Sequence, residues 1–131
     1  GQMPRSLGLA LASKLFRKTS LVRDLKDLSS NGDEVCFCTI GDASTSEGIF
    51  WEAVNSASVQ RIPMLVSIWD DGYGISVPKA DQTANRKVAN NFTGFKNLKI
   101  FHCNGPLLYN LYIWVAFNDL LKYLILKLDK I

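Results

Sequence analysis

The fold is decided by residues 35–43, which read Val35-Cys36-Phe37-Cys38-Thr39-Ile40-Gly41-Asp42-Ala43. The run up to Ile40 is apolar at nearly every position, which is typical of a parallel strand that is buried on both faces. A glycine and an aspartate follow it directly. The stretch therefore predicts a buried strand that ends near Gly41 and carries the Asp42 carboxylate just beyond its end.

The residues after this strand predict a helix and a second strand. Apolar side chains recur at helical spacing at Ile49, Phe50, Ala53, Val54 and Ala57. Ser44 and Glu47 have the spacing of a capping box, which predicts that the helix begins at Ser44. Pro63 is expected to end it, and the apolar residues 64–69 predict the second strand.

The flanking segments extend this alternation of strands and helices. An amphipathic helix is predicted with Pro4 in its first turn, and it continues through Lys18 because Leu7, Leu11, Leu15 and Phe16 recur at helical spacing. Residues 98–103 predict a third strand, and residues 106–131 predict an atypical apolar C-terminal helix. We therefore expect an α/β fold with an open parallel sheet and flanking helices, built as one domain by residues 1–105.

Composition excludes several classes of function. The net charge is only +3, and the basic residues are scattered, so nucleic-acid binding is not expected. The apolar run 107–117 is shorter than the ~20 residues that span a bilayer, so no membrane contact is expected. Cys36, Cys38 and Cys103 are odd in number and lack zinc spacing, which favours reduced, buried thiols.

Two carboxylates are expected to meet at one edge of the sheet. Parallel strands joined by a helical crossover end at the same edge, so Asp42 and Asp71 should lie close together. Beside them, the amides at the helix start near Ser44 could bind an anion such as a phosphate group. Magnesium prefers several oxygen ligands and could bridge the carboxylates to a diphosphate. From spacing alone, solvated loop carboxylates explain the pattern at least as often.

A longer match to a known family adds to this interpretation. The matching segments are Ile40-Gly41-Asp42-Ala43-Ser44-Thr45-Ser46-Glu47-Gly48, Glu52-Ala53-Val54-Asn55, Ile62-Pro63-Met64 and Trp69-Asp70-Asp71-Gly72-Tyr73-Gly74-Ile75. With the N-terminal Gly1-Gln2-Met3-Pro4, they resemble the alpha subunit of the thiamine diphosphate-dependent dehydrogenase component of 2-oxo acid dehydrogenase complexes. The resemblance covers roughly residues 1–105. It is closest to bacterial forms in which alpha and beta halves are fused, which implies a cytoplasmic bacterial protein and a chain that is part of something longer.

The resemblance implies a set of cofactor-binding residues. In the family, a Gly-Asp-Gly motif and a later Asn-Asn pair hold magnesium diphosphate. By resemblance, Asp42, Asp71 and the backbone carbonyl of Tyr73 bind magnesium, and the amides of Ala43 and Ser44 lie near the diphosphate of thiamine diphosphate. Ala43 replaces the usual glycine, which is tolerable only if its φ is not positive.

The second difference from the family pattern adds negative charge to the site. Asp70-Asp71 stands where the family has two asparagines. Aspartate keeps an oxygen ligand but adds negative charge near a diphosphate, so the affinity for metal should rise while the affinity for cofactor without metal falls.

Other polar and aromatic residues in the matching region are expected to be structural. Glu52 and Asn55 match the family helix, and Asn55 could contact the loop that bears Asp71. Trp51 and Trp69 are expected to be packing residues rather than cofactor contacts. His102 is the only histidine and matches no catalytic motif, so no catalytic residue is assigned.

The resemblance implies part of an enzyme that decarboxylates pyruvate or a branched-chain 2-oxo acid and transfers the acyl group to a lipoyl group. Its implied partners are a beta subunit or beta half and a lipoyl-bearing acyltransferase core, in an oligomer. Family catalytic histidines and the activating glutamate fall outside these residues, so the chain alone is expected to be inactive. A degenerate, non-catalytic fragment or assembly piece is the alternative. A nucleotide-binding α/β domain is disfavoured because Gly-x-Gly-x-x-Gly and Walker motifs are absent.

Overall fold

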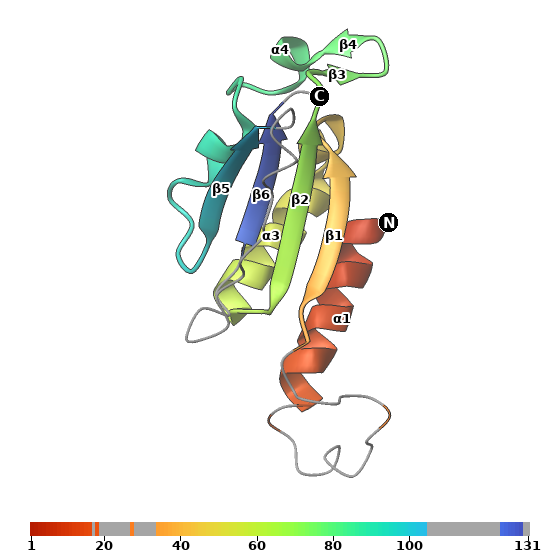
Figure 1. Ribbon diagram of the computed structural model, residues 1–131, viewed down its shortest axis with the longest axis vertical. Helices are drawn as coiled ribbons and strands as arrows, with labels where there is room; N and C mark the ends of the chain where they lie inside the picture. Colours follow the sequence, from red (N-terminus) through yellow and green to blue (C-terminus); the bar gives the residue numbers. More distant parts are fainter. Residues whose placement is uncertain (17, 19–26, 28–33, 105–123, 130–131) are drawn as a thin grey trace.

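The computed structural model describes residues 1–16, 18, 27, 34–104 and 124–129. Its centre is a four-stranded sheet in the order β1 (Cys36–Gly41), β2 (Met64–Asp70), β6 (Leu124–Asp129) and β5 (Lys99–Asn104) (Figure 1). Every neighbouring pair in this sheet is parallel. The predicted α/β fold with an open parallel sheet is therefore confirmed.

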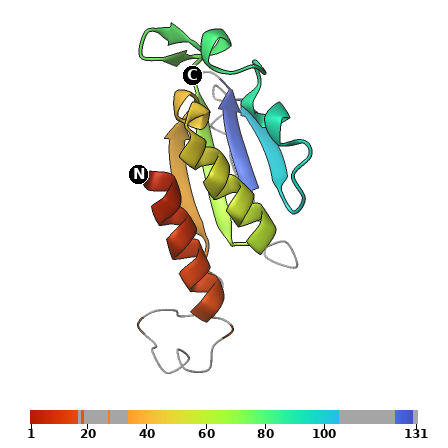
Figure 2. The same ribbon diagram turned by 180° about the vertical axis from the view of Figure 1, so that it is seen from behind.

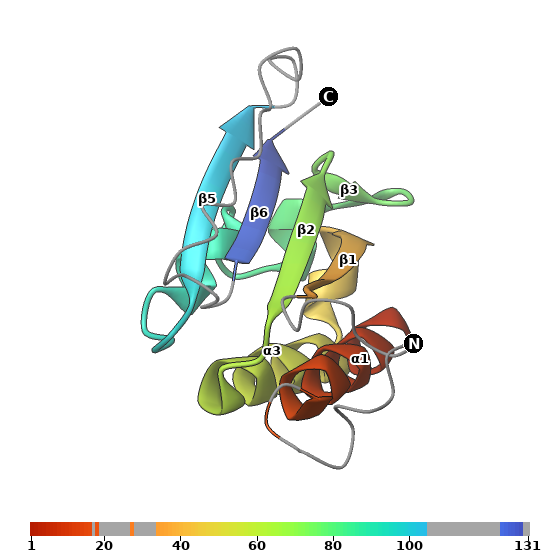
Figure 3. The ribbon, with the colours of Figure 1, turned by 60° about the horizontal axis from the view of Figure 1, so that its bottom comes forward.

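Two helices, α1 (Gln2–Phe16) and α3 (Gly48–Gln60), lie side by side on one face of this sheet (Figures 2 and 3). The buried residues of α1 are Met3, Ser6 and Ala10. Ser13 continues this face, because its hydroxyl donates to the carbonyl oxygen of Glu34 at 3.0 Å. Leu15 is consequently turned outward and is 50% exposed. The predicted leucine face of this helix was wrong at that position.

The connection between β1 and α3 differs from the predicted capping box. A short 3-10 helix, η1 (Ala43–Ser46), follows the strand, and α3 begins at Gly48 rather than Ser44. The carboxylate of Asp42 accepts a hydrogen bond from the next backbone N–H, so Asp42 caps the turn in place of Ser44. Glu47 precedes α3 without a side-chain capping bond.

The predicted C-terminal helix over residues 106–131 was wrong for residues 124–129, which form β6. This strand lies between β2 and β5, and Ile125 is in register with Val66 on one side and Ile100 on the other. Backbone hydrogen bonds to two neighbouring strands favour an extended conformation for a run rich in leucine and isoleucine. Residues 105–123 and 130–131, with the apolar run 107–117, lie outside the described residues.

The remaining elements lie at the carboxyl-terminal edge of the sheet or contribute to the core. A hairpin of β3 (Tyr73–Gly74) and β4 (Val77–Pro78) continues into α4 (Lys79–Gln82), at the carboxyl ends of the strands (Figure 1). The 3-10 helix η2 (Val88–Phe92) adds Val88 and Phe92 to the core. Trp51 stacks on Phe92 with ring centroids 4.9 Å apart, which confirms its predicted packing role. The largest fully buried side chains are Phe50, Phe92, Ile62, Ile68, Val88 and Thr45.

Two of the three cysteines are described, and both are free thiols. Cys38 is buried with its sulfur 3.7 Å from the sulfur of Met3, and Cys36 is half-buried. The side chain of Cys103 lies outside the described residues. None of the helices in the described ranges is long and apolar enough to cross a membrane.

Candidate functional site

A cleft of about 600 Å³ opens at the carboxyl ends of β1 and β2. The hairpin β3–β4, α4 and η1 surround this edge of the sheet (Figure 1). The residues that line the cleft are Gly41, Asp42, Ala43, Ser46, Glu47, Trp69, Asp70, Asp71, Tyr73, Gly74, Ile75 and Gln82. Of the residues predicted to hold the cofactor, Asp42, Ala43, Asp71 and Tyr73 are thus brought together here, whereas Ser44 is not among them.

Asp42 lies one residue beyond β1 and is held by the sheet itself. Its backbone N–H donates to the carbonyl oxygen of Trp69 at 3.0 Å, which extends the pairing of β1 with β2. The residue is only 3% exposed. Oδ1 accepts the Ala43 N–H at 3.0 Å, whereas the buried Oδ2 accepts no hydrogen bond from the residues that the structure describes. The backbone of Ala43 does not have a positive φ, so the condition for alanine at this position is met.

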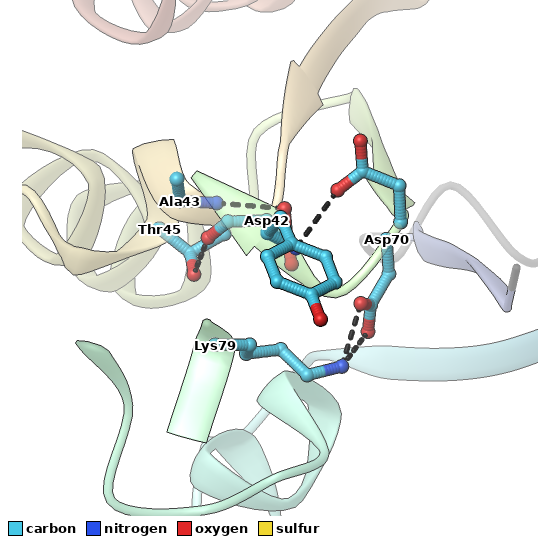
Figure 4. Close-up of polar contacts among 7 residues, drawn as sticks. Asp42, Ala43, Thr45, Asp70 and Lys79 are labelled. Atoms are coloured by element: carbon cyan, nitrogen blue, oxygen red, sulfur yellow. Dashed lines mark hydrogen bonds and ion pairs between the residues drawn. The ribbon is translucent and has the colours of Figure 1, made fainter. Parts of the chain in front are cut away.

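Asp70 is a second buried carboxylate in the cleft, and the sequence analysis did not assign it a role. It ends β2 and is 4% exposed. The ammonium group of Lys79 lies 2.6 Å from both of its oxygens, so the two side chains form a bidentate ion pair (Figure 4). Lys79, at the start of α4, does not appear in the predicted site either.

The proximity of these carboxylates changes the chemistry of Asp42. Burial raises the pKa of Asp42, and the negative charges of Asp70 and Asp71 raise this pKa further, against the lowering effect of the Ala43 N–H. When Asp42 is ionised, its buried Oδ2 is an acceptor without a donor among the described residues, which a cation would satisfy.

Asp71 and Tyr73 are positioned by a tight turn. Asp71 is exposed, and its Oδ1 accepts the backbone N–H of Tyr73 at 3.0 Å across Gly72, whose φ is +87°. Tyr73 and Pro78 form a non-hydrogen-bonded pair of the hairpin, because the cross-strand bond runs from the Lys79 N–H to the Gly72 carbonyl oxygen, so the Tyr73 carbonyl is turned away from β4. The predicted approach of Asp71 to Asp42 is confirmed, because both line one cleft and the charge of Asp71 acts on Asp42.

No group of three or more His, Cys, Asp or Glu side chains in metal-binding arrangement is found within the described ranges. A site built on two carboxylates and a carbonyl oxygen is compatible with that finding, because its third ligand comes from the backbone. Magnesium accepts such a partial set and keeps water or phosphate oxygens at its remaining positions.

The other residues named from the sequence lie apart from the cleft, with one exception. Ser44 is exposed in η1, and its role near a diphosphate stays a prediction. Glu52 and Asn55 are exposed on α3, and His102 is exposed on β5; none of the three lines the cleft. Trp69 is the exception. It lines the cleft at 50% exposure, and its role as a packing residue rather than a cofactor contact stays a prediction.

Comparisons with known proteins identify relatives of this chain. The model of the family described as dehydrogenase E1 component matches residues 1–106. The alpha subunit of a 2-oxoisovalerate dehydrogenase from Bacillus subtilis is 29% identical over 94 residues, which are 72% of this chain and 24% of that protein. The E1 component subunit alpha of a pyruvate dehydrogenase from Staphylococcus epidermidis is 39% identical over 81 residues, or 62% of this chain and 21% of that protein.

A plant relative that the chain matches is also an alpha subunit. The mitochondrial 2-oxoisovalerate dehydrogenase subunit alpha 2 from Arabidopsis thaliana is 33% identical over 82 residues, which are 62% of this chain and 14% of that protein. The chain thus spans about a quarter or less of the length of these relatives. Because the family model matches most of its residues, the chain belongs to the dehydrogenase E1 component family and corresponds to a segment of its alpha subunits.

Proposed function

We propose that the cleft binds thiamine diphosphate through magnesium, as part of the E1 component of a 2-oxo acid dehydrogenase. The observation that carries this proposal is the buried Oδ2 of Asp42, which accepts no hydrogen bond from the described residues at the edge of a cleft that also holds Asp71 and Tyr73. A buried, ionised oxygen without a donor is costly unless a cation compensates it. The site therefore fits a hard divalent cation.

The proposed ligands are Asp42, Asp71 and the carbonyl oxygen of Tyr73. The β1–β2 pairing holds the backbone of Asp42, and the turn at Gly72 holds Asp71 against Tyr73. The diphosphate would complete the coordination of the metal, near the amides of Ala43 and Ser44. Bound thiamine diphosphate supplies the carbon nucleophile and the electron sink that decarboxylation of a 2-oxo acid requires.

The proposed substrate and partners follow from the family. Relatives are named pyruvate dehydrogenase and 2-oxoisovalerate dehydrogenase, so we propose a 2-oxo acid, either pyruvate or a branched-chain one. Because those relatives are alpha subunits of an E1 component, the proposed partners are a beta subunit or beta half and a lipoyl-bearing acyltransferase core. The chain itself contributes the metal and diphosphate anchors.

Titration calorimetry of the purified chain with thiamine diphosphate at saturating Mg²⁺ tests the proposal. Asp42→Ala should abolish binding, because loss of a ligand leaves the diphosphate charge poorly compensated. Asp71→Asn should retain it, because the amide oxygen still coordinates. Glu52→Ala is the matched control, since it removes an exposed carboxylate that lies outside the cleft.

The same measurement separates the proposal from the alternative of a degenerate fragment. A ligand that binds only the folded state must raise the melting temperature. If Mg²⁺ and thiamine diphosphate leave the melting temperature of the wild-type chain unchanged, the chain is not a cofactor-binding piece. Unchanged binding in Asp42→Ala would remove Asp42 from the site.

A further inference from the structure

Lys79 is held by two contacts, one through its backbone N–H and one through its side-chain ammonium group. Its backbone N–H donates to the carbonyl oxygen of Gly72 at 2.9 Å, which ties the start of α4 to the turn after Asp71. Its ammonium group contacts both oxygens of Asp70 at 2.6 Å. The side chains of Lys79 and Asp70 are 18% and 2% exposed, so water screens this pair weakly (Figure 4).

This ion pair lies beside the proposed ligands rather than among them. Asp70 and Asp42 are both buried and line the same cleft, and the charge of Asp70 raises the pKa of Asp42. Asp42 Oδ2 is buried without a donor, and it marks the place where a cation is needed. Lys79 supplies a positive charge at this edge of the cleft, but it is committed to Asp70 and leaves Oδ2 of Asp42 uncompensated.

A fixed positive charge affects the two proposed ligands in opposite ways. It repels a divalent cation and, by engaging both oxygens of Asp70, withholds that carboxylate from the metal. It attracts the diphosphate, whose negative charge would otherwise face Asp42, Asp70 and Asp71. At the effective dielectric of a partly buried site, one unit charge several ångströms away changes affinity by about tenfold or more.

We propose that Lys79 is a positioning residue that restrains Asp70 and sets the balance of the site between free divalent cation and diphosphate. This inference rests on the proposed function of the cleft. It also accounts for an aspartate at position 70, because the lysine offsets the charge that this residue adds. A purely structural role for Lys79 would weaken both kinds of binding when the residue is replaced.

Titration calorimetry on the full 131-residue chain distinguishes these roles. In Lys79→Gln, Mn²⁺ alone should bind about tenfold more tightly, and thiamine diphosphate at saturating Mg²⁺ should bind about tenfold more weakly. Lys79→Arg keeps the charge and should resemble the wild type in both titrations. Lys99→Gln is the matched control, because Lys99 is exposed on β5 and does not line the cleft.

Asp70→Asn removes the other partner of the ion pair and should change both affinities in the opposite direction. This second test does not depend on the folding of Lys79→Gln. The substitution leaves the lysine charge unopposed, so Mn²⁺ alone should bind more weakly and thiamine diphosphate more tightly, each by about tenfold. Circular dichroism shows whether either variant has lost its fold. If one has, the titrations of the other variant test the role of Lys79. Changes of the same sign for both ligands, or no change, in the folded variants would overturn the role of Lys79 while leaving the proposed function intact. If wild type and both variants bind neither ligand, both proposals fail.

Discussion

At the scale of single residues, the buried carboxylate of Asp42 lowers the stability of the folded chain when it is ionised. Its raised pKa means that the folded chain disfavours the ionised carboxylate relative to the unfolded chain. For an acid, this cost is absent below the pKa of the unfolded state and complete above the pKa of the folded state. The metal-free protein therefore carries the cost at neutral pH, where a bound cation would offset it.

Asp42→Asn should accordingly raise the free energy of unfolding of the metal-free chain at pH 7. Asparagine removes the buried charge beside Asp70 while it keeps the size of the side chain. The gain should shrink as the pH falls and vanish below ~4, the usual pKa of an aspartate, because Asp42 is then protonated in both states. Urea unfolding in chelator from pH 4 to pH 8 measures this dependence. A gain that is equal at all pH values, or a loss of stability at pH 7, would contradict the assigned cause.

Much of the site could be predicted from the sequence, and the part that was missed has a clear physical signal. Strand residues alternate between the two faces of a sheet. Ile68 and Asp70 share the face that is buried towards the helices, and in β1 so do Ile40 and the following Asp42. Asp70, rather than Asp71, is therefore the buried neighbour of Asp42. The family motif assigns the ligand role to Asp71, whereas the alternation of side chains along β2 indicates that Asp70 is the buried residue.

At the scale of elements, the hairpin β3–β4 and the 3-10 helix η1 approach each other at Gly74. A methyl group added to Gly74 would lie 2.6 Å from the Cβ of Ala43 and 2.5 Å from Nε2 of Gln82. The glutamine can move, because it is the end of a flexible side chain, but the methyl group of Ala43 is fixed to the backbone of η1. The alanine at position 43 thus makes glycine necessary at position 74.

Gly74→Ala should lower the free energy of unfolding by about 1–3 kcal/mol, the usual cost of overpacking. Ala43→Gly combined with Gly74→Ala should recover part of this loss, because it removes the fixed methyl group. Thermal unfolding of both single variants and of the double variant measures the free energy of unfolding for a double-mutant cycle. Strictly additive effects would show that the two positions do not touch.

The sequence predicted an element correctly where a local pattern of residues determines it. The prediction failed where contacts with distant parts of the chain determine the element. Both β1 and β2 were found because each is a continuous apolar run. The start of α3 was misplaced because Ser44 and Glu47 have capping spacing, whereas Asp42 captures the turn. For β6, an aliphatic run such as Leu124-Ile125-Leu126 suits either a helix or a strand, and only its place between β2 and β5 decides between them.

At the scale of the whole molecule, β6 shows that the sheet does not end at residue 105. The family match covers residues 1–106, yet residues 124–129 occupy a central position in the strand order. The sheet face opposite α1 and α3 carries Phe37, Trp69 and Phe101, each roughly half exposed. Sequence patterns alone do not report such exposure, because it depends on which elements cover a face.

The isolated 131-residue chain should show no detectable decarboxylation of pyruvate or of branched-chain 2-oxo acids, even with saturating thiamine diphosphate and Mg²⁺. The proposed anchors at Asp42, Asp71 and Tyr73 hold the metal and the diphosphate, but they do not move protons at the reacting carbon. His102, the one histidine in the sequence, is exposed on β5 and does not line the cleft. Each missing general acid or base lowers the rate by a factor of roughly 10² to 10⁴, so the absence of several such groups should place turnover below detection. An assay with an artificial electron acceptor measures this, with Asp42→Ala as the background control. Turnover by the wild-type chain that disappears in Asp42→Ala would show that residues of this segment supply the proton transfers themselves.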